Sequence, residues 1–173
     1  EIDDGGAVSE RPLPWAQLAE ITKCLKVRDL LPSTIPAADQ HEIMQYLGQK
    51  WFDCLRHPRL SYLAMNTFAT ALITNLQSPA KHPPLHLYSA HDSALIGLLC
   101  AFRLNPPKEW PPYGSFLKIE LVEMTAMEGD AEPEHVVRFS LNGKTLECEW
   151  SDREDCITLE RLVEKVTTEG ASA

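Results

Sequence analysis

A histidine and an aspartate stand side by side at positions 91 and 92. An imidazole can donate hydrogen bonds to an anion, and a carboxyl group can give a proton to a leaving oxygen. The apolar run Leu-His-Leu-Tyr-Ser at residues 85–89 predicts a buried strand before the pair, and residues 93–103 predict a helix after it. The pair would then lie where open α/β sheets bind ligands, and the helix N-terminus there would favour an anion.

The same pair also has a purely structural interpretation. Asp92 is a good N-cap for a helix that starts at Ser93, and His91 could be a hydrogen-bonded histidine at a strand end. On spacing alone this alternative is favoured, because a strand followed by a capped helix is common.

The rest of the chain predicts helices before this pair and mainly strands after it. Asp39 with Glu42 is typical of a capping box that opens the second of three upstream helices. Asn142-Gly143 is a strong hairpin signal, and Thr158 can cap a last helix. The remaining predicted segments are a loose start at 1–13, a linker at 78–84, a strand at 116–122 and an acidic loop at 125–134.

Composition narrows the classes of function. The chain has 173 residues, 44% of them hydrophobic, which suits one domain of ordinary size with a real core. A formal net charge of −9 argues against a nucleic-acid partner, which would need a basic face. We expect neither a membrane span nor a signal peptide in this sequence. Since there are five cysteines, at least one is free or pairs outside the chain.

The surroundings of the histidine and aspartate resemble a known family. Residues 88–95, Tyr-Ser-Ala-His-Asp-Ser-Ala-Leu, are followed by Trp-Pro-Pro-Tyr-Gly-Ser-Phe-Leu-Lys-Ile-Glu-Leu at 110–121. Together they are similar to the second signature of the histidine acid phosphatases, and residues 137–144 and 148–159 continue the likeness. The resemblance implies an α/β fold, a mixed sheet flanked by helices of the phosphoglycerate mutase-like type. It also implies a mainly helical part at 1–84 beside the active site and an α/β portion at 85–173.

The resemblance also implies a chemistry, the hydrolysis of phosphomonoesters through a phosphohistidine. By this likeness His91 binds the phosphate and Asp92 protonates the leaving oxygen, which would favour acidic operation. No metal and no cofactor are expected. The family pattern further implies a Cys148–Cys156 disulfide and a secreted, lysosomal or membrane-anchored ectodomain.

One departure from the family pattern is serious. The first signature, Arg-His-Gly-x-Arg-x-Pro, which supplies the nucleophile, is not in the sequence. The only Arg-His pair, Arg56-His57, lacks the glycine, and we interpret it as an inter-helix turn with solvated charges. We therefore expect the C-terminal half of such an enzyme, with the N-terminal half as partner and a homodimer as a further candidate. The alternative is an inactive phosphatase-derived fragment that acts as an interaction or structural module.

Overall fold

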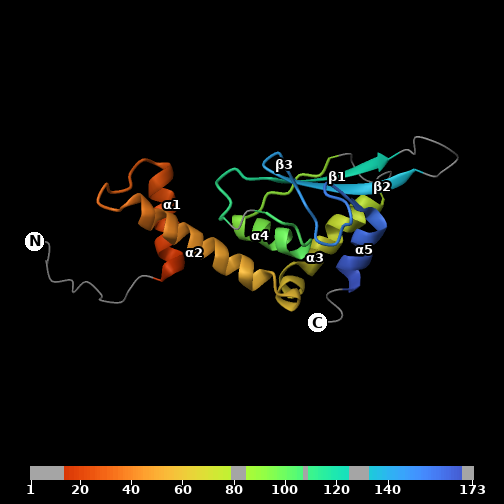
Figure 1. The fold of residues 1–173 in the computed structure, drawn as a ribbon, viewed down its shortest axis with the longest axis horizontal. Helices are drawn as coiled ribbons and strands as arrows, with labels where there is room; N and C mark the ends of the chain where they lie inside the picture. Colours follow the sequence, from red (N-terminus) through yellow and green to blue (C-terminus); the bar gives the residue numbers. More distant parts are fainter. Residues whose placement is uncertain (1–13, 79–84, 107–108, 125–132, 169–173) are drawn as a thin grey trace, which may run out of the picture. The chain divides into compact units, whose positions relative to one another are not determined.

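The computed structural model of the chain describes residues 14–78, 85–106, 109–124 and 133–168. Backbone contacts divide the chain into two units, Glu1–Leu47 and Gly48–Ala173. The described elements are α1 (Trp15–Val27), α2 (Ala37–Leu55), α3 (Pro58–Gln77), α4 (Asp92–Ala101), β1 (Leu117–Met124), β2 (Glu134–Leu141), β3 (Lys144–Leu146), β4 (Ile157–Thr158) and α5 (Leu159–Thr168). Figure 1 labels each of them except β4. The predicted segment 1–13, the linker at 79–84 and most of the acidic loop, 125–132, lie outside the described residues.

The first unit contains α1 and the first part of α2. The rings of Trp15 and Tyr46 lie 5.0 Å apart between their centroids and hold these helices together. The predicted capping box is wrong, because α2 begins at Ala37 and Asp39 lies inside its first turn. The backbone N–H of Gln40 already donates to the carbonyl of Pro36, so the helix starts ahead of the expected cap.

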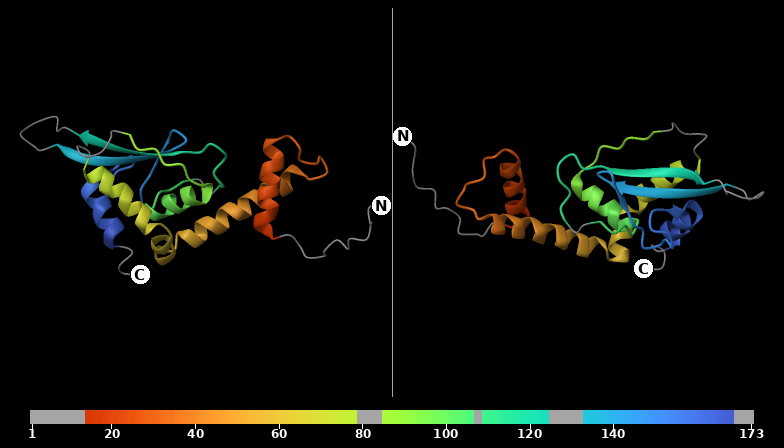
Figure 2. Two further views of the ribbon diagram at one scale, coloured as in Figure 1. Left: turned by 180° about the vertical axis from the view of Figure 1, so that it is seen from behind. Right: turned by 45° about the horizontal axis from the view of Figure 1, so that its top comes forward.

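The second unit is built on an antiparallel sheet with β2 at its centre. β1 pairs with the whole length of β2, while β3 and β4 pair along its other side. Asn142 and Gly143 have φ angles of 51° and 82°, the left-handed values that the two-residue hairpin between β2 and β3 requires. Figure 2 shows α3, α4 and α5 on the same side of this sheet.

The core lies between those helices and the sheet. It includes Ile96 and Leu99 of α4, Val137 and Phe139 of β2, and Leu162 of α5, all almost fully buried. Gly97 lets α4 approach α3 closely, since a Cβ there would lie 2.6 Å from the sulfur of Met65. Helices that pack on a sheet around one core confirm the predicted α/β class. No helix in the described part of the chain is both long and apolar enough to cross a lipid bilayer.

The strand predicted at residues 85–89 does not form. These residues pair with none of the described strands, and Leu87 is 85% exposed where a central strand would be buried. A strand needs a hydrogen-bonded neighbour, and the described ladders join β1, β3 and β4 only to β2. Tyr88 fastens the segment to α3 instead: its hydroxyl accepts a 2.8 Å hydrogen bond from Asn75, and its ring packs edge-on against Phe68.

Candidate active site

Asp92 is the first residue of α4, and His91 occupies the N-cap position. The expectation that Asp92 itself is the N-cap is thus wrong by one residue. One carboxylate oxygen, Oδ1, accepts a 2.8 Å hydrogen bond from the backbone N–H of Ser93. The other, Oδ2, accepts a 2.7 Å hydrogen bond from the indole Nε1–H of Trp110. The half-buried carboxyl group is therefore held at both oxygens.

His91 lies at the surface beside this carboxyl group. Its backbone carbonyl accepts the N–H of Leu95, which makes the first turn of α4. Within the described residues its exposed imidazole makes no hydrogen bond and no ion pair. The structural alternative, in which His91 is a hydrogen-bonded histidine, therefore does not fit the described residues.

Trp110 is the site residue that sequence reasoning missed. It reaches Asp92 from a loop 18 residues further along the chain. The available signal was its place before Pro111-Pro112, because a residue that precedes a proline is restricted to extended backbone. The ring of Trp51 packs edge-on against Trp110 at a centroid distance of 5.9 Å, so the indole is supported from α2 as well.

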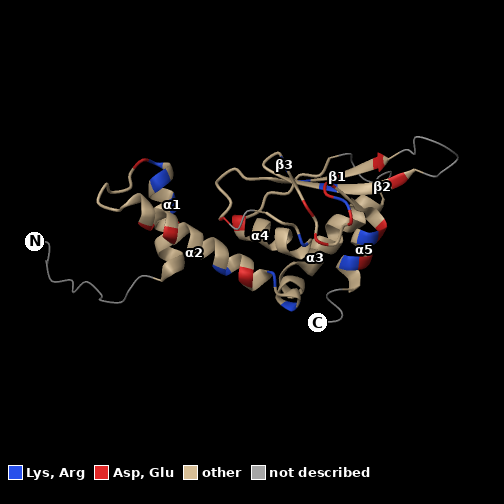
Figure 3. Ribbon diagram, viewed as in Figure 1, with Lys and Arg blue, Asp and Glu red and all other residues tan. Residues whose placement is uncertain are grey.

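Positive charge is scarce around this pair. Figure 3 shows acidic residues at the start of α4 and in the loop that follows it, without a basic residue beside them. In the described residues 85–106 and 109–117 the only Lys or Arg is Arg103, and its Nη1 donates to the backbone carbonyl of Arg56. Lys144 of β3 lines the same cleft as Trp110, so further cationic donors for a phosphoryl group would have to come from another part of the enzyme.

Arg56 and His57 form the turn between α2 and α3, as expected, but Arg56 is not simply solvated. Its guanidinium donates to the carboxylate of Glu149 at 2.7 Å, to the carbonyl of Leu104 at 2.6 Å and to the side chain of Asn105 at 3.1 Å. Arg56 thus ties the turn to two loops, which is a structural role.

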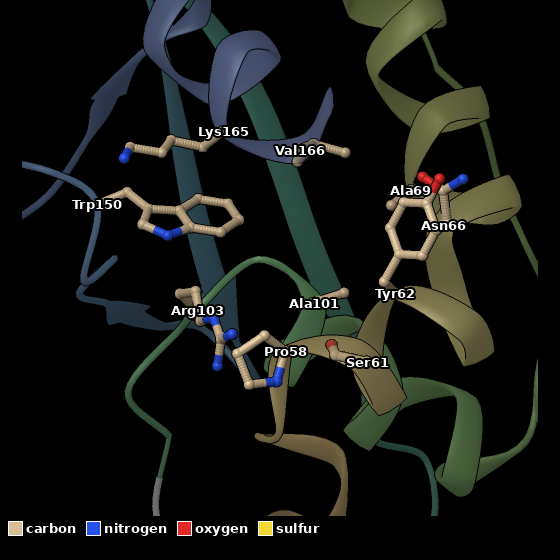
Figure 4. A pocket seen from close by; sticks show the side chains of 10 residues that line it. All are labelled: Pro58, Ser61, Tyr62, Asn66, Ala69, Ala101, Arg103, Trp150, Lys165 and Val166. Atoms are coloured by element: carbon tan, nitrogen blue, oxygen red, sulfur yellow. The ribbon is translucent and has the colours of Figure 1, made fainter. Parts of the chain in front are cut away.

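The small cavity in Figure 4 is a different site. It is lined by α3, α5, Arg103 and Trp150, and the buried hydroxyl of Ser61 faces it without a hydrogen-bond partner. Its volume of about 30 Å³ has room for roughly one water molecule, which excludes a phosphomonoester.

The predicted Cys148–Cys156 disulfide is wrong. Both residues are buried free thiols, and the sulfur of Cys148 donates to the backbone carbonyl of Phe102 at 3.3 Å. Cys148 is held there by a backbone bridge to Leu104, so its side chain is occupied in the core. Burial raises the pKa of the Cys148 thiol to about 11 and does the same to that of Cys100.

These thiols should react slowly with iodoacetamide. At pH 8 a pKa of about 11 leaves only about one part in a thousand as thiolate, which is the reactive form. We expect exposed Cys54 to be alkylated quickly, and Cys100 and Cys148 only after unfolding, as measured by peptide mass spectrometry. Cys54→Ser is the control and should remove fast labelling at that peptide. A Cys148–Cys156 peptide pair that alkylates only after reduction would contradict the structure.

Comparison with known proteins places the chain in a family. No curated protein matches it. A family model does match residues 36–142, well over half of the chain, and its description is histidine phosphatase superfamily (branch 2). The match includes His91, Asp92 and Trp110. The chain therefore belongs to the histidine phosphatase superfamily, in the branch of the histidine acid phosphatases, whose members are generally enzymes that act on phosphate groups.

Proposed function

We propose that this chain supplies the proton-donating part of an acid phosphatase that hydrolyses phosphomonoesters through a phosphohistidine intermediate. One observation carries the proposal: an exposed imidazole stands beside a carboxyl group held by two hydrogen bonds at the start of α4, inside the family match. The imidazole can bind phosphoryl oxygens and the carboxyl group can move a proton.

The reaction balances with these two groups and an external nucleophile. A histidine of the nucleophile segment attacks phosphorus, the bond from phosphorus to the ester oxygen breaks, and Asp92 gives its proton to the leaving oxygen. Asp92, now a carboxylate, then takes a proton from the water that attacks the phosphohistidine, and phosphate leaves. His91 donates hydrogen bonds to the non-bridging oxygens, where negative charge develops.

The nucleophile segment is proposed to be the N-terminal half of the same enzyme. Three features support this partner: the sequence has no Arg-His-Gly motif, the described site has almost no cations, and residues 85–90 are exposed without a strand neighbour. A strand of the partner beside residues 85–89 would supply that neighbour. We further propose a lysosomal or secreted location, where an acidic medium can be supplied. Because Cys148 and Cys156 are free thiols, no disulfide between them supports this location.

The alternative function is that of an interaction module without catalysis. The exposed apolar side chains of Leu85 and Leu87, two residues apart in one segment, favour it, because exposed apolar patches mark interaction surfaces. The two functions differ in whether a nucleophile segment accompanies this chain, which the intact mass of the natural protein would show.

His91→Ala in the complete enzyme should weaken inhibition by phosphate, vanadate and tartrate. Losing a hydrogen bond to a charged group costs about 1.5–3 kcal/mol, so inhibition constants should rise by about 10- to 100-fold. Competitive inhibition with p-nitrophenyl phosphate measures this, and circular dichroism checks that the secondary structure is intact. His57→Ala, at the exposed turn, is the matched control. Unchanged inhibition would make His91 a structural residue.

A further inference from the structure

The hydrogen bond between Trp110 and Asp92 has the geometry of a strong interaction. Its length of 2.7 Å is typical of a donor that meets a charged acceptor. Because Ser93 holds the other oxygen at 2.8 Å, the two donors together define the plane in which the carboxyl group lies. Removing the indole N–H would take away the side-chain donor that holds Oδ2 in this plane.

Trp110 is itself held in place by its loop. Pro111 and Pro112 follow it directly and have fixed backbone φ angles, so this part of the loop has few alternative conformations. At the far end of the loop the side chain of Asn142 accepts the N–H of Phe116 at 2.9 Å and donates to the hydroxyl of Ser115 at 3.1 Å. The loop is thus clamped to the β2–β3 hairpin.

The aromatic ring of Trp110 has a second environment besides Asp92. Trp51 packs against it edge-on, and the ring also lines an apolar cleft of about 210 Å³ with Phe52, Leu99 and Leu141. Phenylalanine at position 110 keeps an aromatic ring for these contacts while losing the N–H donor. The two contributions of the residue can therefore be separated by mutation.

We propose that Trp110 is a positioning residue for Asp92, and this role rests on the function proposed above. Its indole N–H orients the carboxyl group toward the leaving oxygen. When Asp92 gives up its proton, negative charge grows on the carboxylate and the hydrogen bond from Trp110 strengthens. The bond therefore stabilises the transition state of proton transfer more than the ground state.

Trp110→Phe in the complete enzyme tests the role. We expect kcat on an alkyl phosphate to fall on the order of tenfold, the cost of one hydrogen bond to a charged group, with KM nearly unchanged. Losing a donor disfavours the carboxylate, so the limb where activity falls with rising pH should move to higher pH. His91 and Glu109 are the titratable neighbours of the pair along the chain. The variants His91→Gln and Glu109→Gln test whether either of them, rather than Asp92, sets this limb of the pH profile. Trp15→Phe, in the first unit, is the matched control.

A second readout does not depend on activity. In protein labelled with ¹⁵N-tryptophan, the indole N–H resonance that disappears in Trp110→Phe should shift in Asp92→Asn and stay in place in Glu109→Gln. If it does not respond to Asp92→Asn, the hydrogen bond is absent and the proposal fails. If the wild-type enzyme is active and Trp110→Phe has the same kcat and pH profile, only the positioning role fails. A complete wild-type protein that hydrolyses no phosphomonoester overturns the proposed function, and the role of Trp110 with it.

Discussion

Asp92→Asn in the complete enzyme should lower kcat on alkyl phosphates by about 10²- to 10⁴-fold, the usual contribution of a general acid. An alkoxide is a poor leaving group, so the bond from phosphorus to oxygen breaks only as the oxygen receives a proton. An asparagine amide has no proton of suitable acidity to give. The loss should therefore be in the chemical step rather than in binding.

The comparison with p-nitrophenyl phosphate makes the experiment specific. Its phenolate is stable without a proton, so Asp92→Asn should slow the phosphoryl-transfer step, seen as the burst rate, far less for this substrate than for an alkyl phosphate, while the later hydrolysis of the phosphohistidine slows equally for both. Burst and steady-state measurements on both substrates give the two ratios. Asp152→Asn, a change at an exposed carboxylate paired with Arg161, is the control and should leave both rates unchanged. Equal losses of the burst rate on the two substrates would remove Asp92 from the role of acid.

Stability must be measured beside these rates. In the structure both oxygens of Asp92 accept hydrogen bonds, from Ser93 and from Trp110. Asparagine replaces one oxygen by an NH₂ group, which would face an N–H donor. We expect this mismatch to cost about 1–3 kcal/mol of unfolding free energy, visible as a lower Tm. Kinetics recorded well below that Tm separate the chemical loss from partial unfolding.

Local sequence signals predicted the elements that depend on nearby residues. The hairpin at Asn142-Gly143 formed because its two left-handed φ angles are determined within the turn itself. The last helix starts after Thr158, whose hydroxyl accepts the backbone N–H of Arg161 as a cap does. α4 was predicted from its apolar pattern, and its residues Ile96–Cys100 are all buried.

Apart from the helix caps expected at Asp39 and Asp92, the features that failed depend on residues far away in the sequence. An apolar run such as Leu85–Tyr88 can form a strand only beside another strand, and no pattern within the run shows whether that neighbour exists. The link from Trp110 to Asp92 crosses a helix and a loop, so no spacing rule points to it. The supposed disulfide was inferred from a family pattern, whereas the burial of Cys148 against Phe102 is set by tertiary packing.

The 173-residue chain by itself should be inactive on phosphomonoesters at every pH. The nucleophile motif is absent from its sequence, and Arg103, the one Lys or Arg in the described residues 85–106 and 109–117, donates to the backbone carbonyl of Arg56. The chain should also self-associate, because Leu85 and Leu87 are 69% and 85% exposed in a segment that pairs with none of the described strands.

Sedimentation velocity at several concentrations measures the association. Leu87→Asp should shift the chain toward monomer, since it places a charge in the exposed segment. Val27→Asp is a matched control, because Val27 is also largely exposed but belongs to the first unit. If Val27→Asp abolishes association and Leu87→Asp does not, the association surface lies on the first unit. Residues 85–90 are then not the segment that causes self-association.

Adding a segment that carries Arg-His-Gly-x-Arg-x-Pro, as a second chain or as a fusion, should restore activity at acidic pH and remove the self-association. The two effects should appear together, because the same partner would cover residues 85–90 and bring the nucleophile and arginines to His91. Trapping the intermediate with labelled substrate should place the phosphohistidine on the added segment. Label on His57, or on any other histidine of the 173-residue chain alone, would show that this chain carries its own nucleophile, because the phosphorus must bond to the histidine that attacks it.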